Sequence, residues 1–385
     1  MFIGITGPLC SGKHTVAQYL VEKHNFTYLT LTDSTHPSVD YDCVRFHTLK
    51  EMQIYVTERW LENFVTCDVD GRGLWLFKKR PFFLLVSIEA PISVRFQRHV
   101  QRCQQNGENE LGLLEFVIQN DLALFNIPED DSTMLITDPM SPSRPRKQLS
   151  TTQSHTPLYT LMSLSDVTIA NAYQSVPQLH ACLDDLDLTN HERLRPSWDT
   201  YFMHLSDLAA RRSNCMKRRV GCILVRDSRV IATGYNGTPK GLRNCNEGGC
   251  QRCNDATPCG TGLDRCLCMH AEENALLEAG RERVGPGKGV ILYCNTCPCL
   301  GCAIKIVQTG VKEVVFSKSY GMDDFIAKVF AEAGVKLRQH SPPSMRLEMQ
   351  VDVTEVDSSI IGKMGWMNSD VMRRRGSQDP NNHNS

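Results

Sequence analysis

The sequence has 385 residues, of which 41% are hydrophobic and 22% are charged, an ordinary composition for globular domains. Its 42 Lys and Arg nearly balance 43 Asp and Glu, so no global basic field would hold it on nucleic acid or on an anionic membrane. The length suits two domains and a tail.

The N-terminus, MFIGITGPLCSGK, lacks the basic start and long apolar core of a secretory signal, and no apolar run is long enough to span a bilayer. We therefore expect a cytoplasmic protein, with the nucleus as a further compartment, whose 17 cysteines are thiols or metal ligands. Five cysteines are spread over the first 190 residues, whereas twelve lie between Cys215 and Cys302. Such crowding favours metal binding.

Residues 1–190 predict an α/β domain built on a parallel sheet. The strand FIGIT leads through a Gly-rich turn into a helix, and residues 80–91 predict a buried strand followed by another helix. Residues 165–186 predict the last strand and a closing helix. Between these elements, residues 128–158 are rich in Pro, Ser and Thr, which predicts a flexible insertion.

The turn after the first strand, GPLCSGK, nearly matches the P-loop pattern GxxxxGK followed by Ser or Thr. The expected phosphate-binding residues are Gly7, Gly12, Lys13, His14 and Thr15. His14 stands where the pattern places a hydroxyl on Mg²⁺, which argues against efficient phosphoryl transfer. We favour a phosphate-binding domain with weak catalysis over an active kinase.

Residues 191–340 predict a three-layer α/β/α domain. A first helix over 198–213 is followed by a hairpin that turns at Asp227-Ser228, a cysteine-rich loop, and three helix–strand repeats. Two of the repeat helices are expected to end at Gly310 and Gly334. Residues 341–385 predict a disordered tail.

His270, Cys299 and Cys302 predict a zinc site. Cys299 and Cys302 form a Cys-x-x-Cys pair at a helix start, where unpaired N–H groups stabilise thiolates. Three protein ligands leave a fourth position for water, as in catalytic zinc sites. Glu272 follows His270 by two residues and can reach that water, so it is expected to shuttle the proton to the reacting ring.

The two segments His-Ala-Glu (270–272) and Pro-Cys-Leu-Gly-Cys (298–302) match the recognised signature of zinc nucleobase deaminases. A polynucleotide cytosine or adenine deaminase is an alternative, but the near-neutral charge and 7% aromatic content speak against it. A catalytically inactive, zinc-stabilised nucleotide-binding module is another alternative. The presence of Glu272 argues against it, because a structural zinc has no use for that carboxylate.

Residues 212–245, which include GYNGTP, followed by CLCMHAEENALLEAG and TCPCLGC, resemble the deoxycytidylate deaminases of the fungal type. The resemblance covers 196–340 and implies hydrolysis of dCMP to dUMP and ammonia, which feeds thymidylate synthesis. It also implies hexamers that dCTP activates and dTTP inhibits, with an effector or substrate pocket near Tyr235, Asn236 and Gly237. The alternative for those three residues is an ordinary turn at the end of a hairpin, with no role in binding.

Some members of the family carry a second, structural zinc, and here Cys215, Cys245 and Cys268 match its ligands. The fourth ligand is open among Cys250, Cys253, Cys259 and Cys266, with Cys253 preferred. We expect packed thiols at Cys222, Cys294 and Cys297. Seven basic residues could bind the substrate phosphate, and the sequence does not distinguish between them: Arg211, Arg212, Lys217, Arg218, Arg219, Lys240 and Arg243.

The N-terminal half resembles small nucleotide or coenzyme kinases of the dephospho-coenzyme A kinase kind. That resemblance places Arg95 and Arg98 in a lid-like position.

Overall fold

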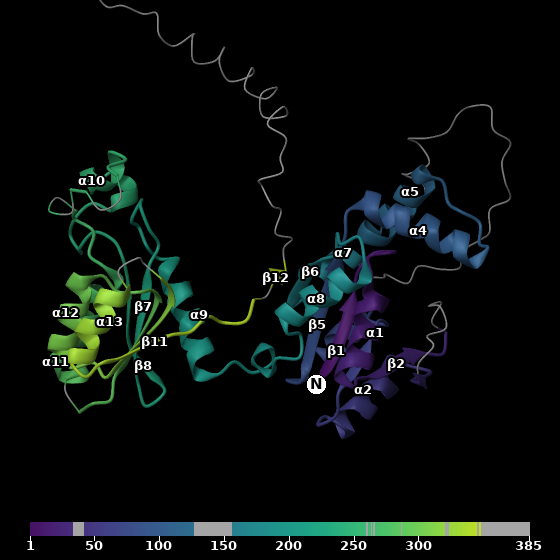
Figure 1. Ribbon diagram of the computed structural model, residues 1–385, viewed down its shortest axis with the longest axis horizontal. Coiled ribbons are helices and arrows are strands. Elements are labelled where there is room, and N and C mark those ends of the chain that lie inside the picture. Colours follow the sequence, from purple (N-terminus) through teal and green to yellow (C-terminus); the bar gives the residue numbers. More distant parts are fainter. Residues whose placement is uncertain are drawn as a thin grey trace, which may run out of the picture.

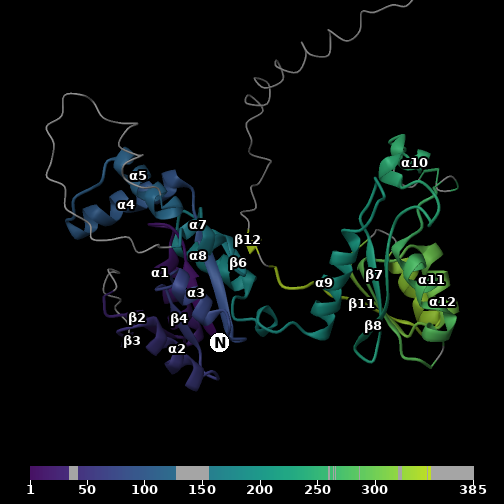
Figure 2. The same ribbon diagram turned by 180° about the vertical axis from the view of Figure 1, so that it is seen from behind.

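The computed structural model describes residues 1–33, 42–126, 156–258, 261–262, 264, 266–285, 287–319, 323–344 and 346–347. Figures 1 and 2 show two lobes, an N-terminal one that carries the P-loop segment and a C-terminal one that carries the cysteine-rich segment. None of the helices within these ranges is long and apolar enough to cross a membrane.

The N-terminal lobe is built on a parallel sheet of seven strands in the order β12-β6-β5-β1-β4-β2-β3. Its strands are β1 (Phe2–Thr6), β2 (Thr27–Leu31), β3 (Cys43–Phe46), β4 (Phe64–Thr66), β5 (Phe83–Glu89), β6 (Val167–Ala170) and β12 (Arg346–Leu347). Its helices are α1 (Lys13–His24), α2 (Leu49–Glu58), α3 (Gly71–Phe77), α4 (Ile92–Asn106), α5 (Leu113–Phe125), α7 (Leu158–Ser163) and α8 (Val176–Leu186).

Both faces of this sheet are covered. On β1, Ile3 and Ile5 belong to one buried cluster and Phe2 to another, because successive side chains of a strand point to opposite faces. This explains why the strand sequences are apolar throughout rather than alternating. The predicted parallel α/β architecture of this half is confirmed.

The C-terminal segment returns to the N-terminal sheet. Arg346 and Leu347 form β12, which pairs in parallel with Thr168 and Ile169 of β6. The prediction of disorder from residue 341 onward is therefore wrong at this point, because backbone pairing leaves no periodic signal in two residues. Residue 345 and residues 348–385 of that tail lie outside the described residues, as does the predicted insertion up to residue 155.

The C-terminal lobe contains a five-stranded sheet in the order β11-β10-β9-β7-β8. Its strands are β7 (Gly221–Arg226), β8 (Arg229–Tyr235), β9 (Ile291–Thr296), β10 (Glu313–Lys318) and β11 (Lys336–Gln339). Its helices are α9 (Trp198–Ala210), α10 (Gln251–Asn254), α11 (Ala271–Val284), α12 (Leu300–Thr309) and α13 (Asp323–Glu332), and short 3₁₀ turns, η2 and η3, lie at His191–Arg193 and Cys245–Glu247. Strands β9, β10 and β11 are parallel, and β7 is antiparallel to β8 and β9.

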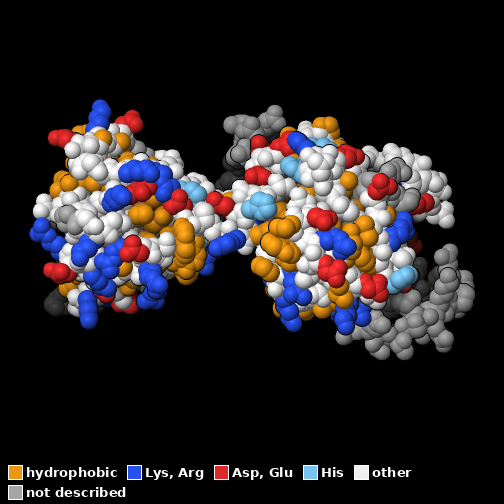
Figure 3. All heavy atoms as spheres, turned by 90° about the horizontal axis from the view of Figure 1, so that it is seen from below, with side chains coloured by type: hydrophobic (Ala, Val, Ile, Leu, Met, Phe, Trp, Pro, Cys, Tyr) orange, Lys and Arg blue, Asp and Glu red, His pale blue; other side chains and the backbone are white. Residues whose placement is uncertain are grey.

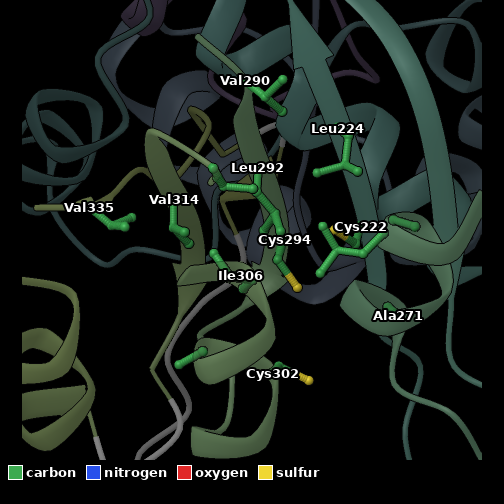
Figure 4. Close-up of a cluster of buried hydrophobic side chains, with 14 of the residues drawn as sticks. Cys222, Leu224, Ala271, Val290, Leu292, Cys294, Cys302, Ile306, Val314 and Val335 are labelled. Carbon is green, nitrogen blue, oxygen red and sulfur yellow. The ribbon is translucent and has the colours of Figure 1, made fainter. Parts of the chain in front are cut away.

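Helices cover the two faces of this sheet, as predicted. Phe202 of α9 packs with Ile223 on one face, whereas Cys222 and Leu224 of the same strand face α11 and α12. Figure 4 shows Cys222 and Leu224 on that second face, with Ala271 and Cys302 on the helices beside them.

The predicted turns of this lobe are confirmed. Asp227 and Ser228 have φ values of 52° and 56°, the left-handed backbone that a tight two-residue hairpin requires. Gly310, with φ of 84°, caps α12, and Gly334, with φ of 71°, follows α13.

Gly234 on β8 allows α11 to pack directly onto the sheet. A Cβ at this position would lie 2.1 Å from the carbonyl oxygen of Ala271 and 2.5 Å from the amide nitrogen of Ala275. Only a residue without a side chain permits this approach. The contact fixes the first turn of α11, and with it His270, against the end of the hairpin.

Candidate active site

Two helix N-termini bring the predicted zinc ligands together. His270 is the N-cap of α11, and Cys299 is the N-cap of α12, which follows the carboxyl end of β9. The Nδ1 atom of His270 lies 3.3 Å from the Sγ atoms of both Cys299 and Cys302.

Glu273 holds these two helix starts in place. Its carboxylate accepts a hydrogen bond from the backbone N–H of His270 at 3.0 Å, which completes a capping box. The same carboxylate forms an ion pair with Lys305 of α12. Glu273 is therefore a structural link between the helices, and its neighbour Glu272 has a different environment.

The three ligand atoms suit a zinc ion. They all lie within 4.8 Å of one another. Atoms bound tetrahedrally to one zinc at about 2.0–2.3 Å stand about 3.5 Å apart, close to the observed separation. One imidazole and two thiolates are ordinary zinc donors, and a set of three leaves one position open.

Glu272 is buried beside these ligands, with 3% of its surface exposed. Burial raises the pKa of its carboxyl group, and a hydrogen bond from its own backbone N–H opposes this shift. A carboxyl group whose pKa is brought toward neutral pH can both accept and return a proton.

The two thiols of the site have different pKa values. Hydrogen bonds from Cys302 and from His270 lower the pKa of Cys299 to about 4, against the opposing effect of burial. Donation to Cys299, together with burial, raises the pKa of Cys302. The hydrogen bond to Cys299 raises the pKa of His270, although its burial opposes this. Of these three ligand groups, only Cys299 therefore favours its negatively charged form.

A cavity of about 560 Å³ opens onto the site. His270, Glu272 and Cys299 line one part of it, and Lys217 and Arg218 line another. Its size lies within the usual range for small-molecule pockets. Two of the seven cations that the sequence left unranked are thus placed in the same cavity as the predicted zinc site.

The segment Tyr235-Asn236-Gly237 divides between two roles. Asn236 lines the cavity, and its side-chain oxygen accepts hydrogen bonds from the Val220 N–H at 2.8 Å and the Ser213 hydroxyl at 2.7 Å. Tyr235 and Gly237 do not line this cavity. Instead, the Gly237 backbone exchanges hydrogen bonds with Met269, directly ahead of His270.

The remaining cysteines of the C-terminal lobe fall into two groups, packed thiols and thiols that converge on one another. Cys222, Cys294 and Cys297 are buried within the sheet core, as predicted for packed thiols. The thiols of the second predicted zinc site converge within 4.8 Å of one another, and these are Cys215, Cys245, Cys253 and Cys268. Cys250 and Cys266 join Cys253 and Cys268 in an overlapping set of four, and Cys259 lies outside the described residues.

The P-loop segment wraps a second cavity, of about 570 Å³. Gly12, Lys13, His14 and Thr15 line it, whereas Gly7 does not. A Cβ at Gly7 would lie 2.4 Å from the carbonyl oxygen of Ile88, so that glycine permits close packing of the turn. Burial lowers the pKa of Lys13.

Arg95 and Arg98 brace this loop rather than covering it as a lid. Arg98 donates hydrogen bonds to the carbonyl oxygens of Cys10 and Ser11, both at 3.4 Å, and also to Asn171. Arg95 donates to the carbonyl oxygen of Leu9 at 3.4 Å and is itself buried. Arg98 nevertheless lines the cavity, together with Arg102, which sequence reasoning missed.

Two family models and several curated proteins match this chain. Residues 196–318 match the family model described as the cytidine and deoxycytidylate deaminase zinc-binding region, and residues 3–114 match an AAA domain model. A deoxycytidylate deaminase of Schizosaccharomyces pombe is 47% identical over 347 residues, covering 89% of this chain and 98% of its own. One of Saccharomyces cerevisiae is 40% identical over 341 residues, covering 89% and 97%.

A deoxycytidylate deaminase of Mycobacterium phage D29 is 40% identical over 129 residues, which covers 32% of this chain and 97% of the phage protein. The two yeast proteins therefore share almost the whole chain, whereas the phage protein shares about a third of it.

Proposed function

The chain belongs to the deoxycytidylate deaminase family, and on that premise we propose that it hydrolyses dCMP to dUMP and ammonia at the site formed by His270, Cys299, Cys302 and Glu272. The observation that carries the proposal is the buried Glu272 carboxyl group beside three zinc-type donors in one cavity. A zinc ion bound by these donors would lower the pKa of a water molecule and so supply the nucleophile at neutral pH.

The proposed work of Glu272 is proton transfer. Its carboxylate takes a proton from the attacking water and delivers it to the ring nitrogen of cytosine. It then carries the second proton of that water to the amino group, which leaves as ammonia. Burial supports this role, because it excludes bulk water and brings the carboxyl pKa closer to neutral pH.

Lys217 and Arg218 are proposed to bind the 5′-phosphate, because they line the cavity that holds Glu272. Asn236 is proposed to shape the pocket, since its amide also donates to the Arg218 carbonyl oxygen at 2.7 Å. The same pocket segment is the proposed place where dCTP activation and dTTP inhibition are sensed. We also propose that the chain forms a hexamer, as the resemblance to this family implies.

Cys215, Cys245, Cys253 and Cys268 are proposed to hold a second, structural zinc, a role their convergence supports. We also propose two functional domains, residues 1–190 and 191–340. The first is proposed to be a phosphate-binding module. Cys10 and Gly12 have positive φ values, and such turns can direct backbone N–H groups toward an anion.

Deamination by the purified chain tests the main proposal. dCMP, CMP, cytidine and a cytosine-containing oligonucleotide would be offered, each with and without dCTP or dTTP, and ammonia release would be followed. Turnover of dCMP in preference to the others is expected. Zinc-loaded protein that turns over none of them would overturn the proposal.

The oligonucleotide in this assay tests the alternative, deamination of a polynucleotide, which predicts turnover of the oligonucleotide in preference to dCMP. On the face shown in Figure 3, basic and acidic side chains of the described residues are interspersed over both lobes. This pattern gives little support to a track for a nucleic acid strand, which would need a stripe of positive charge.

A further inference from the structure

The cysteine-rich projection between β8 and α11 has a core made of thiols. Its buried residues are Cys245, Cys250 and Cys253, and the partly buried side chains packed against them are also cysteines: Cys215, Cys266 and Cys268. Within its described residues, the regular elements are the short η3 and α10, and Figure 1 shows α10 at the end of the lobe. So small a unit needs a cross-link or a metal to stay folded.

The spacing of the sulfur atoms distinguishes a metal from a disulfide. The Sγ atom of Cys253 lies 3.9 Å from those of Cys215, Cys266 and Cys268, and Cys250 lies 4.0 Å from Cys266. A disulfide holds sulfurs at about 2.0 Å. Tetrahedral zinc with bonds of about 2.3 Å to sulfur separates its thiolates by about 3.8 Å, which matches the observed spacing.

The six thiols form two overlapping sets of four, not one set with two spare members. One set comprises Cys215, Cys245, Cys253 and Cys268, and the other comprises Cys250, Cys253, Cys266 and Cys268. Cys253 and Cys268 belong to both. Two tetrahedra that share an edge have this arrangement, and the shared edge is the 3.9 Å separation between those two sulfurs.

We propose that the projection binds a pair of zinc ions through six thiolates, with Cys253 and Cys268 bridging the two metals. The proposal extends the single structural zinc considered above and does not depend on the deamination reaction. Sulfur-only tetrahedral sites select zinc over harder cations. The full chain would then carry three zinc ions, one at the catalytic site and two in this six-thiol cluster.

Polar groups around the cluster suit its negative charge. Six thiolates and two Zn²⁺ ions carry a net charge of −2. The guanidinium of Arg252 lies 3.6 Å from the sulfur of Cys266. The backbone N–H of Met216 donates to the sulfur of Cys245, and the backbone N–H of Leu267 donates to the sulfur of Cys250, both at 3.4 Å. Such N–H···S hydrogen bonds hold the ligands in orientation and offset the charge.

The cluster also positions residues of the active site. Cys268 precedes the zinc ligand His270 by two residues, and Cys215 precedes Lys217 by two residues. Cys253 and Cys268 line the same cavity as His270 and Lys217. Loss of the cluster is therefore expected to raise KM and to lower kcat, because it displaces both the phosphate-binding segment and the segment that carries His270.

Counting metal in the full-length chain tests the proposal. Zinc per chain would be measured by native mass spectrometry and by elemental analysis after dialysis against metal-free buffer. Three ions are expected. Two ions, a disulfide among the six cysteines, or iron with inorganic sulfide would each overturn the proposal.

Single substitutions give a pattern that only shared ligands produce. Cys253→Ser should remove both ions of the cluster and leave one per chain, whereas Cys266→Ser should remove one and leave two. His270→Ala should leave the two cluster ions. Cys182→Ser, in the N-terminal lobe, is the matched control and should retain all three.

A spectroscopic measurement on the unaltered protein covers the case in which a variant fails to fold. After exchange with ¹¹³Cd²⁺, two cadmium signals typical of sulfur-only coordination are expected, with mutual splitting through the shared thiolates. A single such signal, or two without coupling, would refute the bridged arrangement. Deaminase activity can fail while the metal count holds, so this outcome is distinct from failure of the proposed function.

Discussion

The Nδ1 atom of His270 lies 3.3 Å from the Sγ atom of Cys302, although 32 residues separate them in the chain. The contact exists because α11 and α12 begin at the same edge of the sheet and because Glu273, in the first turn of α11, forms an ion pair with Lys305 in the second turn of α12. A metal site built on two helix starts inherits the rigidity of both.

Glu272→Gln should retain the fold and bound zinc while lowering kcat by about 10²–10⁴-fold, because general acid–base catalysis contributes about that much. Turnover of dCMP and zinc content would be measured on the same preparation. Release of zinc by this substitution would show that Glu272 is a ligand and contradict the proton-transfer role.

Glu273→Gln is the matched control for that substitution. It removes the charge that pairs with Lys305 but leaves Glu272 in place. Its chief effect should be on stability, of about 0.2–1 kcal/mol as for other partly exposed ion pairs, because the Gln amide oxygen can still cap the helix. A loss of kcat as large as that of Glu272→Gln would mean that the two carboxylates were assigned the wrong roles.

Gly234→Ala should destabilise the C-terminal lobe, because the new methyl group would lie 2.1 Å from the Ala271 carbonyl oxygen. Overpacking of this kind typically costs about 1–3 kcal/mol. A lower melting temperature and a weaker affinity for zinc are expected together, since α11 must move away from the sheet. Gly112→Ala, whose methyl group would meet only a side-chain oxygen at 3.7 Å, should leave both unchanged.

Asp199→Asn should reveal an acid-sensitive part of the stability. The Asp199 carboxylate accepts hydrogen bonds from Arg338 at 2.6 and 2.9 Å and from the Tyr293 hydroxyl at 2.8 Å, and the Arg338 contact lowers its pKa below 3.8. A lowered pKa in the folded state stabilises the protein above the unfolded pKa, and this stabilisation is lost as the pH falls through the folded pKa.

At neutral pH, Asp199→Asn is therefore expected to lower the free energy of unfolding by about 1–3 kcal/mol. The difference from the unaltered protein should shrink below about pH 4, as followed by urea unfolding at several pH values. Asp227→Asn, at a side chain that is 89% exposed, is the control and should leave the free energy of unfolding within about 0.5 kcal/mol of the unaltered protein. A constant difference at all pH values would exclude the ion pair as its source.

Lys13→Ala should weaken binding of ATP to the N-terminal lobe by at least about tenfold, because the P-loop lysine contacts the phosphates in this class of site. Binding would be measured by calorimetry with the full chain. Lys23→Ala, on the same helix but paired with Asp184, should bind as the unaltered protein does. Equal, measurable ATP affinity in Lys13→Ala and the unaltered protein would rule out this loop as the binding site.

The hairpin, the repeat helices and the place of the three proposed zinc ligands at helix starts could be predicted, because each carries a local signal. Asp227-Ser228 needs a turn backbone, and His270 and Cys299 stand in a fixed pattern ahead of helices. β12 could not be predicted, because a two-residue strand is specified by its partner β6 rather than by its own side chains.

Arg98 shows the same limit in the N-terminal lobe. The resemblance to coenzyme kinases implied a lid-like position, yet its guanidinium donates hydrogen bonds to the carbonyl oxygens of Cys10 and Ser11. A charged side chain can bind a ligand or hydrogen-bond to a loop of its own chain, and the sequence does not show which of these two roles it has.

By itself, the sequence determined the set of candidate chemical groups: one imidazole, two thiols and a carboxyl group at spacings that suit helix starts. Only the tertiary structure decided which cations share the cavity with Glu272, and that Cys253 and Cys268 lie within two sets of thiols at once. Ligand type and local spacing are covalent properties of the chain. The sharing of a sulfur or a cavity depends on distances between segments that only packing brings together.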